Sequence, residues 1–276
     1  MIDDTRKPVG IFDSGVGGLT VLKALKARLP GEDFCYLGDT ARLPYGTKSA
    51  ASVLRYARQA AEHLRRRDIK LLVIACNTAS AVALEDLAAE WAPLPVLGVV
   101  EPGASAAVAA APAGRHLVLA TEATVGLHAY GRAIAARDGA ASVRELACEL
   151  LVSLAEEGWT GGGIAEAIVR QYLGRFLERD GAGGWRPDSI ILGCTHFPLL
   201  RDTIRIVAGE GVSIVDSAGT TAEAVAALLE ARQWLNPSAA GRLELLATDG
   251  ASRFARVGGA FLGAEVLPSD VQIVDL

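Results

Sequence analysis

Two cysteines, Cys76 and Cys194, occupy equivalent positions in two similar stretches of the sequence. Leu71–Thr78 and Ser189–His196 each contain an apolar strand-like run, a small residue, a cysteine and polar side chains, and a helical pattern follows. In open α/β sheets, ligands bind beyond the carboxyl ends of the strands, where helix N-termini present their N–H groups. The positive end of a helix dipole favours a thiolate at such a position. We therefore expect Cys76 and Cys194 to be reactive thiols.

The other two cysteines have more ordinary settings. Cys35 lies inside the strand-like run Phe34–Leu37, and Cys148 lies in a helical pattern. Free cysteine commonly packs as a small buried hydrophobe, and we expect that role for both. Cys194 and His196 could ligate zinc, but the sequence has no CxxC or HxxxH pair to complete a site. A metal site is therefore not predicted.

The first glycine-rich turn, Asp13–Gly18, follows a strand-like run and opens a helical pattern, and Asp39 ends the next strand. This arrangement is similar to a dinucleotide-binding fingerprint with its ribose-binding acid. The third glycine of that fingerprint would fall on Thr20, and Asp13 would repel a pyrophosphate. An anion site for a carboxylate fits the turn equally well. No Walker motif is present and no lysine is singled out for a Schiff base, so no cofactor is predicted.

Short apolar runs alternate with longer amphipathic patterns along the chain. Several of the runs are continuously apolar, which is typical of strands buried on both faces. This alternation predicts an α/β fold with mostly parallel sheets flanked by helices. The expected strands are Val9–Phe12, Phe34–Leu37, Leu71–Ala75, Val96–Val99, His116–Ala120, Ser189–Gly193 and Ser213–Val215. The two cysteine segments lie about one domain length apart, which suggests two similar α/β halves that face each other.

Composition and charge exclude several classes of protein. Of the 276 residues, 51% are hydrophobic and 21% charged, as in a globular protein. The net charge of -5 provides no basic surface for nucleic acid. Met1–Pro8 lacks the apolar core of a signal peptide, and Leu94–Ala113 is interrupted by Glu101 and three prolines. We expect a cytoplasmic protein with reduced cysteines and no membrane partner.

Five motifs, in order along the chain, resemble those of the glutamate racemases, within the aspartate/glutamate racemase family. They are Gly10–Leu19 (GIFDSGVGGL), Gly38–Gly46 (GDTARLPYG), Ala75–Ala79 (ACNTA), Leu192–Leu200 (LGCTHFPLL) and Asp216–Ala222 (DSAGTTA). Weaker correspondences extend the resemblance over essentially the whole chain, at Thr121–Val125, Cys148–Gly158, Ala247–Asp249 and Phe261–Gly263. The resemblance implies cofactor-independent interconversion of L- and D-glutamate, which supplies D-glutamate for bacterial peptidoglycan.

The resemblance also implies two pseudo-symmetric α/β domains with the active site in the cleft between them. The first domain would comprise residues 1–97 and 208–276, and the second would comprise residues 98–207. Racemisation removes the α-proton from one face of the substrate and delivers a proton to the other, so an acid and a base must flank the substrate. The resemblance assigns these roles to Cys76 and Cys194, with Asp13 assisting Cys76 and His196 assisting Cys194.

Glu156 lies where the family carries a supporting acid beside the second cysteine. Two prolines expected in this segment are replaced by Glu149 and Ser153, so Glu157 is an alternative. Donors around the substrate carboxylates would stabilise the charge that develops in the transition state. The resemblance implies that the substrate is bound by Asp13, Ser14, Asp39, Tyr45, Gly46, Asn77, Thr78, Thr195 and His196.

Three other functions stay open at this point. The same two-thiol chemistry would serve a racemase for aspartate or another acidic amino acid. A nicotinamide-dependent oxidoreductase rests only on the first glycine turn and Asp39. A non-catalytic protein with two domains could close on a carboxylate ligand. In each case the partner is a small molecule, and the oligomeric state is open, with a homodimer among the candidates.

Overall fold

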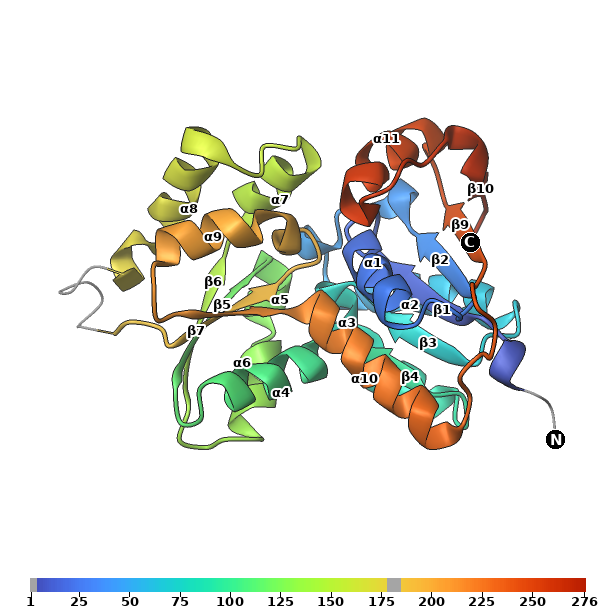
Figure 1. Ribbon diagram of the computed structural model, residues 1–276, viewed down its shortest axis with the longest axis horizontal. Coiled ribbons are helices and arrows are strands. Elements are labelled where there is room, and N and C mark those ends of the chain that lie inside the picture. Colours follow the sequence, from blue (N-terminus) through green and yellow to red (C-terminus); the bar gives the residue numbers. More distant parts are fainter. Residues whose placement is uncertain (1–3, 178–184) are drawn as a thin grey trace. The chain divides into compact units, whose positions relative to one another are not determined.

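The computed structural model describes residues 4–177 and 185–276 (Figure 1). The chain divides into two compact units. The first unit contains the chain up to Val99 together with Ala218–Leu276, and the second contains Val100–Ser217. Each unit is built around its own parallel sheet.

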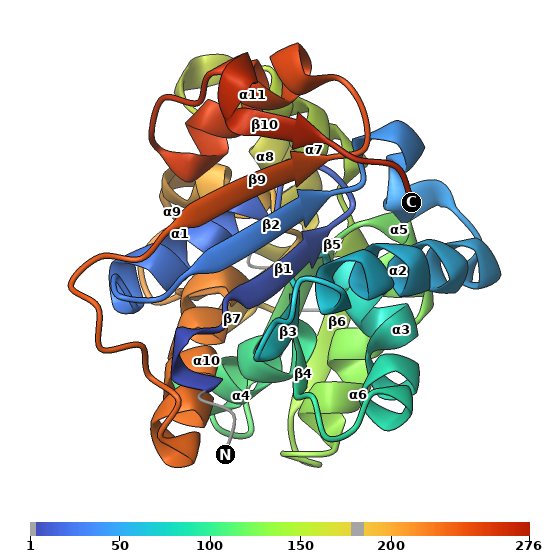
Figure 2. The ribbon, with the colours of Figure 1, turned by 90° about the vertical axis from the view of Figure 1, so that its right-hand side faces the viewer.

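The first unit, over the described residues, contains a six-stranded sheet in the order β10-β9-β2-β1-β3-β4 (Figure 2). All of its strand pairs are parallel. Every residue of β1, β2 and β3 is buried, as the continuous apolar runs predicted. The strands are β1 (Val9–Asp13), β2 (Phe34–Gly38), β3 (Leu71–Ile74), β4 (Val96–Gly98), β9 (Leu243–Ala247) and β10 (Val271–Ile273).

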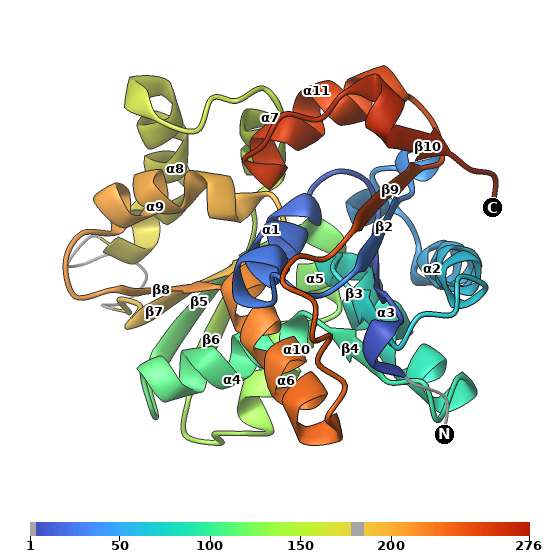
Figure 3. The same ribbon diagram turned by 45° about the vertical axis from the view of Figure 1, so that its right-hand side comes forward.

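Helices cover both faces of this sheet. Figure 3 shows α2 and α3 on one face and α1 on the other. The helices are α1 (Leu19–Arg28), α2 (Ala50–Arg65), α3 (Asn77–Glu90), α10 (Ser217–Arg232) and α11 (Ala251–Leu262). Short 3-10 turns are η1 (Asp4–Arg6), η2 (Thr40–Arg42), η3 (Tyr45–Thr47) and η6 (Pro268–Asp270).

Helix α2 illustrates why these segments fold as they do. The Ser49 side chain accepts a hydrogen bond from the Ser52 N–H and caps the helix. Val53, Ala57 and Leu64 then recur at helical spacing and are fully buried against the sheet. Small alanines on α2 and α3 let both helices approach the strands closely. Each fully buried valine or leucine contributes about 1.5–3 kcal/mol to stability.

The second unit has a four-stranded parallel sheet among its described residues, in the order β6-β5-β7-β8. In Figure 1, α4 and α6 lie on one face of this sheet, and α7, α8 and α9 lie on the other. The strands are β5 (Arg115–Ala120), β6 (Ser142–Ala147), β7 (Ser189–Gly193) and β8 (Ser213–Asp216). The helices are α4 (Val100–Ala110), α5 (Glu122–Gly126), α6 (Ala129–Ala135), α7 (Glu149–Glu156), α8 (Gly162–Leu177) and α9 (Arg201–Ala208), with the 3-10 turn η5 (Phe197–Leu200).

The predicted α/β class with parallel sheets is confirmed, and all seven expected strands are present. The second unit ends after Ser217 and not after Val207, because β8 pairs with β7 and so belongs to the second sheet. Cys148 was expected within a helix, but it lies between β6 and α7 as the N-cap residue of α7. No helix among the described residues combines the length and apolarity needed to cross a membrane.

Candidate active site

In each parallel sheet the carboxyl ends of the strands lie at one edge, and the predicted site residues gather there. Asp13 is the last residue of β1, and Cys76 follows the adjacent strand β3. In the second unit, Cys194 comes directly after β7. These positions agree with the expectation from the sequence.

Cys76 is the N-cap residue of α3. Its Sγ accepts a hydrogen bond from the backbone N–H of Ala79, with 3.4 Å between sulfur and nitrogen. The side chain is only 6% exposed. A sulfur that accepts from a first-turn N–H at the positive end of a helix dipole is stabilised as a thiolate. Asn77 and Thr78 occupy the same first turn and are nearly buried.

Asp13 is held beside Cys76 by the glycine-rich turn. Its Oδ2 accepts from the backbone N–H of Gly15 at 2.9 Å. A Cβ on Gly18 would lie 2.6 Å from the Asp13 Cβ and 3.0 Å from the Ala75 Cβ. Only glycine therefore lets α1 begin this close to the strands that carry Asp13 and Cys76. The glycines of this turn thus serve close helix–strand packing around an acid.

Tyr36, in β2, lies near both Asp13 and Cys76. Its hydroxyl donates to the Gly15 carbonyl at 2.9 Å. Burial raises the pKa of Tyr36 well above its ordinary value, and Asp13 and Cys76 act in the same direction. The Tyr36 hydroxyl therefore stays protonated. Sequence reasoning missed Tyr36, because an aromatic residue within an apolar strand carries no signal beyond packing.

Asp39 is fully buried at the end of β2, and protein donors surround its carboxylate. The Tyr45 hydroxyl donates to Oδ2, the Arg42 Nε lies 2.8 Å from the same oxygen, and the Thr248 hydroxyl donates to Oδ1 at 3.0 Å. The Tyr45 ring contacts Phe12, with 6.1 Å between ring centroids. Burial and Asp39 raise the pKa of Tyr45, which keeps its hydroxyl a donor. Asp39 therefore bonds to Tyr45, Arg42 and Thr248 within the protein, and its expected contact with the substrate stays a prediction.

The second unit places His196 between a thiol and a carboxylate. The Cys194 Sγ lies 3.7 Å from the His196 Nδ1, and the His196 Nε2 lies 3.1 Å from the Glu156 Oε1. Cys194 is 6% exposed, and the Thr195 hydroxyl lies 3.4 Å from the same Nδ1. A carboxylate on one ring nitrogen orients the imidazole and fixes which nitrogen faces the thiol.

Glu156, and not Glu157, is the acid that reaches this histidine. Glu156 is the last residue of α7 and is partly buried, whereas Glu157 is exposed at the C-cap of the helix. The α7 helix packs against η5, which follows His196 directly in the chain. The helix therefore presents Glu156 towards the turn that carries the histidine.

Close packing fixes the second cysteine as it fixes the first. A Cβ on Gly193 would lie 2.9 Å from the Leu119 carbonyl oxygen and 3.0 Å from the Tyr130 ring. The Ser217 hydroxyl donates to the Leu192 carbonyl at 3.0 Å. Burial raises the pKa of Tyr130, so its hydroxyl stays protonated. Nothing in the local sequence signalled Tyr130, because it comes from α6, far from the cysteine motif.

The remaining two cysteines are buried and protonated. Burial raises the pKa of Cys35 to about 12, and its thiol donates to the Glu244 carboxylate at 3.3 Å. Burial also raises the pKa of Cys148, which is completely inaccessible. Both thiols therefore have the packing role that the sequence predicted.

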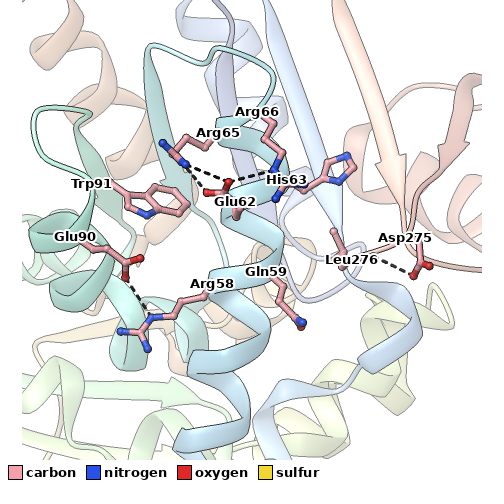
Figure 4. A pocket seen from close by; sticks show the side chains of 10 residues that line it. All are labelled: Arg58, Gln59, Glu62, His63, Arg65, Arg66, Glu90, Trp91, Asp275 and Leu276. Atoms are coloured by element: carbon pink, nitrogen blue, oxygen red, sulfur yellow. Dashed lines mark hydrogen bonds and ion pairs between the residues drawn. The ribbon is translucent and has the colours of Figure 1, made fainter.

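A cavity of about 460 Å³ in the first unit lies away from these residues (Figure 4). It is formed by α2, the end of α3 and the last residues of the chain. Its guanidinium groups are already paired: Arg65 and Arg66 with Glu62, and Arg58 with Glu90. No predicted site residue lines it. Among residues 4–177 and 185–276, no group of three or more histidine, cysteine or acidic side chains could hold a metal ion.

The chain thus consists of two α/β units, and each carries a cysteine at the carboxyl end of a strand. The family model for Asp/Glu/hydantoin racemases matches residues 19–225. The chain belongs to this family and is an enzyme, an isomerase. The family resemblance read from the motifs is therefore confirmed.

Several similar proteins in this family are named as glutamate racemases. A glutamate racemase of Geobacter metallireducens is 48% identical over 98% of this chain and 97% of its own length. The crystal structure of glutamate racemase from Thermus thermophilus with beta-chloro-D-alanine is 43% identical, with a TM-score of 0.87 over 99% of this chain and 98% of that one. The Francisella tularensis enzyme, in complex with D-glutamate, is 34% identical, with a TM-score of 0.88 over 98% of each chain.

An aspartate racemase of Picrophilus torridus shares the fold at a much greater distance. It is 17% identical, with a TM-score of 0.56 over 83% of this chain and 99% of its own. At this identity the likeness concerns the fold alone.

Proposed function

We propose that the protein is a glutamate racemase that interconverts L- and D-glutamate without a cofactor, with Cys76 and Cys194 as its two proton-transfer groups. The observation that carries the proposal is the pair of nearly buried thiols, each at the carboxyl end of a parallel strand and each beside an acid or histidine. The naming of its full-length relatives as glutamate racemases supports the substrate.

The reaction needs one thiolate and one thiol. The thiolate takes the α-proton, and the electron pair of the C–H bond is left on the α-carbon and delocalised into the substrate carboxylate. The thiol then donates its proton to the opposite face, which restores a tetrahedral carbon and leaves the second cysteine as the thiolate. The reverse reaction exchanges the two roles. The proposal therefore requires both cysteines to act on one bound substrate.

The neighbours of each thiol support its role. Asp13 is the acid next to Cys76 in the first unit. His196, oriented by Glu156, lies against Cys194 and can carry the proton to or from its sulfur. Asp13 and His196 are thus proposed to adjust the protonation of the two thiols between turnovers. Glu156 acts through His196 as a positioning residue.

Donors for the two substrate carboxylates come from the first helical turns and from the loop after β2. Ser14, Asn77, Thr78 and Thr195 offer hydroxyl or amide groups at the carboxyl edges of the sheets. The Tyr45 ring is packed and its hydroxyl bonds to Asp39, so we propose that Tyr45 and Gly46 contact the substrate through their backbone. Preorganised donors of this kind stabilise the negative charge that develops in the transition state.

The family resemblance extends the proposal to the cell. D-glutamate would be supplied for peptidoglycan synthesis, and the enzyme would act in the cytoplasm. A homodimer also stays a prediction, which sedimentation of the purified protein can test.

Racemisation of L-glutamate, D-glutamate and L-aspartate by the purified protein, without added cofactor, tests the proposal. Loss of optical rotation should occur with either glutamate enantiomer. The value of kcat/KM should be about 10- to 200-fold lower for aspartate, since one methylene is worth roughly that factor in a shaped pocket. Faster turnover of aspartate would favour the alternative acidic substrate. Thermal stabilisation by glutamate without turnover would favour a binding protein.

A further inference from the structure

The turn that follows β9, Thr248–Asp249, is a motif to which the proposed chemistry gives no role. It lies against the loop after β2, which runs from Asp39 to Gly46 and carries the proposed backbone contacts to substrate. The two segments are separated by 209 residues in sequence between Asp39 and Thr248. Their contacts are hydrogen bonds of side chains to backbone and to a buried carboxylate.

The hydroxyl of Thr248 makes two of these bonds at once. It donates to the Asp39 Oδ1 at 3.0 Å and accepts from the backbone N–H of Ala41 at 2.8 Å. One side chain of the turn therefore bonds both to the acid at the start of the loop and to the backbone two residues later.

A second pair of bonds runs in both directions between Thr40 and Asp249. The Thr40 hydroxyl donates to the Asp249 carbonyl at 2.6 Å and accepts from the Asp249 N–H at 2.9 Å. The Thr248 N–H also donates to the Gly38 carbonyl at 3.2 Å. The turn thus continues the pairing of β9 with β2 beyond the ends of both strands.

The acid at the centre of this network is fully buried, so its charge has to be compensated by protein donors. Two of its donors, Arg42 and Tyr45, belong to the loop itself. Thr248 is the donor from another segment of the sheet. The bond from Thr248 therefore ties the position of the loop to the sheet.

We propose that the Thr248–Asp249 turn is a positioning element for substrate binding, with Thr248 as its central residue. It holds the loop so that the backbone of Tyr45 and Gly46 meets the substrate carboxylate. This inference rests on the proposed function. Thr248 acts through Asp39 and Ala41 and is not itself a catalytic residue.

Thr248→Val tests the inference, because valine keeps the shape of threonine and removes both hydroxyl bonds. We expect KM for glutamate to rise about tenfold with a much smaller change in kcat, because contacts made equally in ground and transition states affect binding. Thr248→Ser keeps the hydroxyl and should restore KM to near the wild-type value. Thr203→Val is the matched control, since it removes a buried hydroxyl bond to the Thr160 carbonyl in the second unit.

Hydrogen exchange of the peptide covering residues 40–48 provides a readout independent of activity. Exchange there should be faster in Thr248→Val than in the wild type, the serine variant and the Thr203→Val control. A KM equal to that of the Thr203→Val control, or unchanged exchange at residues 40–48, would overturn the inference. If the wild type fails to racemise glutamate, the proposed function fails, and the exchange measurement alone decides on the turn.

Discussion

His196 lies between a thiol and a carboxylate, and each of its ring nitrogens has a separate contact. Glu156 lies at Nε2, so Nδ1 is the nitrogen that faces the Cys194 sulfur. A histidine held in this way can take a proton from the thiol or return one.

Replacing Glu156 by glutamine should lower kcat for glutamate about 10- to 100-fold, the range observed when partners that orient metal-binding histidines are lost. The amide keeps the shape but removes the negative charge that lies 3.1 Å from the His196 Nε2, so the pH profile of kcat should also shift. Steady-state kinetics across pH measure both effects. Glu157→Gln is the matched control and should behave as the wild type. Equal kinetics for the two variants would show that Glu156 does not position His196 for catalysis.

At this scale the sequence predicted that Cys76 and Cys194 follow strand ends, but it did not predict all of their neighbours. The pattern of an apolar strand, a cysteine and a helix is local and can be read from consecutive residues. The choice between Glu156 and Glu157 depends on how α7 is rotated against η5, which no local pattern specifies. The contact of Thr248 with Asp39 was not predicted, because the two residues are 209 positions apart in the sequence.

The elements that carry the first thiol depend on close packing at the glycine-rich turn. Helix α1 begins after Gly18, directly against the strand end that carries Asp13 and against Ala75. Any side chain at Gly18 would push α1 away from β1 and β3. The turn therefore couples the start of a helix to the placement of Asp13 and Cys76.

Gly18→Ala should lower the free energy of unfolding by about 1–3 kcal/mol, the usual cost of overpacking, and should reduce racemisation as well. Urea denaturation and turnover of glutamate measure the two effects. Gly139→Ala is the control, because a Cβ there meets nothing within 4 Å. A Gly18→Ala protein as stable and active as that control would contradict the packing role of the turn.

A buried histidine joins two strands of the second sheet at the end opposite to Cys194. His116 in β5 is fully buried, and its Nδ1 lies 2.7 Å from the Ser189 hydroxyl of β7. Burial lowers the pKa of His116 below its ordinary value, although the nearby Asp138 and Asp188 act in the opposite direction. The folded state therefore holds this imidazole neutral at a pH where the unfolded chain has begun to protonate it.

The free energy of unfolding should therefore fall as the pH drops below about 6.5, the ordinary histidine value, through the lowered pKa of the folded state. Above that pH the histidine is neutral in both states and makes no pH-dependent contribution. His116→Gln should make the stability curve flatter between about pH 7 and 5. Urea denaturation at several pH values measures the slope. Identical slopes for wild type and variant would rule out this contribution.

At the element scale, the strands that the sequence missed are the more polar ones. The β6 strand contains Arg144 and Glu145 and lies at the edge of its sheet, and β10 is a short edge strand with exposed residues. The β9 strand carries Glu244, which pairs with Arg67. Continuous apolar runs identify strands buried on both faces, but they do not identify strands that are partly exposed.

At the scale of the whole molecule, the chain consists of two α/β units with parallel sheets, and each unit carries one cysteine at the carboxyl end of a strand. The alternation of apolar runs and helical patterns was sufficient to predict this class. The boundary between the units was harder to predict, because Ser213–Asp216 can be assigned only from its partner strand β7. The proposed chemistry needs both units, since a single thiol cannot both remove and deliver a proton on opposite faces of one carbon.

Racemisation of L-glutamate in D2O tests this two-thiol chemistry most directly. D-glutamate should carry deuterium at the α-carbon from the first turnovers, while recovered L-glutamate should still carry protium. Cys76→Ser and Cys194→Ser should each slow racemisation in both directions by about 10²- to 10⁴-fold. D-glutamate that retains the protium of the substrate would contradict the account, because one group would then both remove and return the proton.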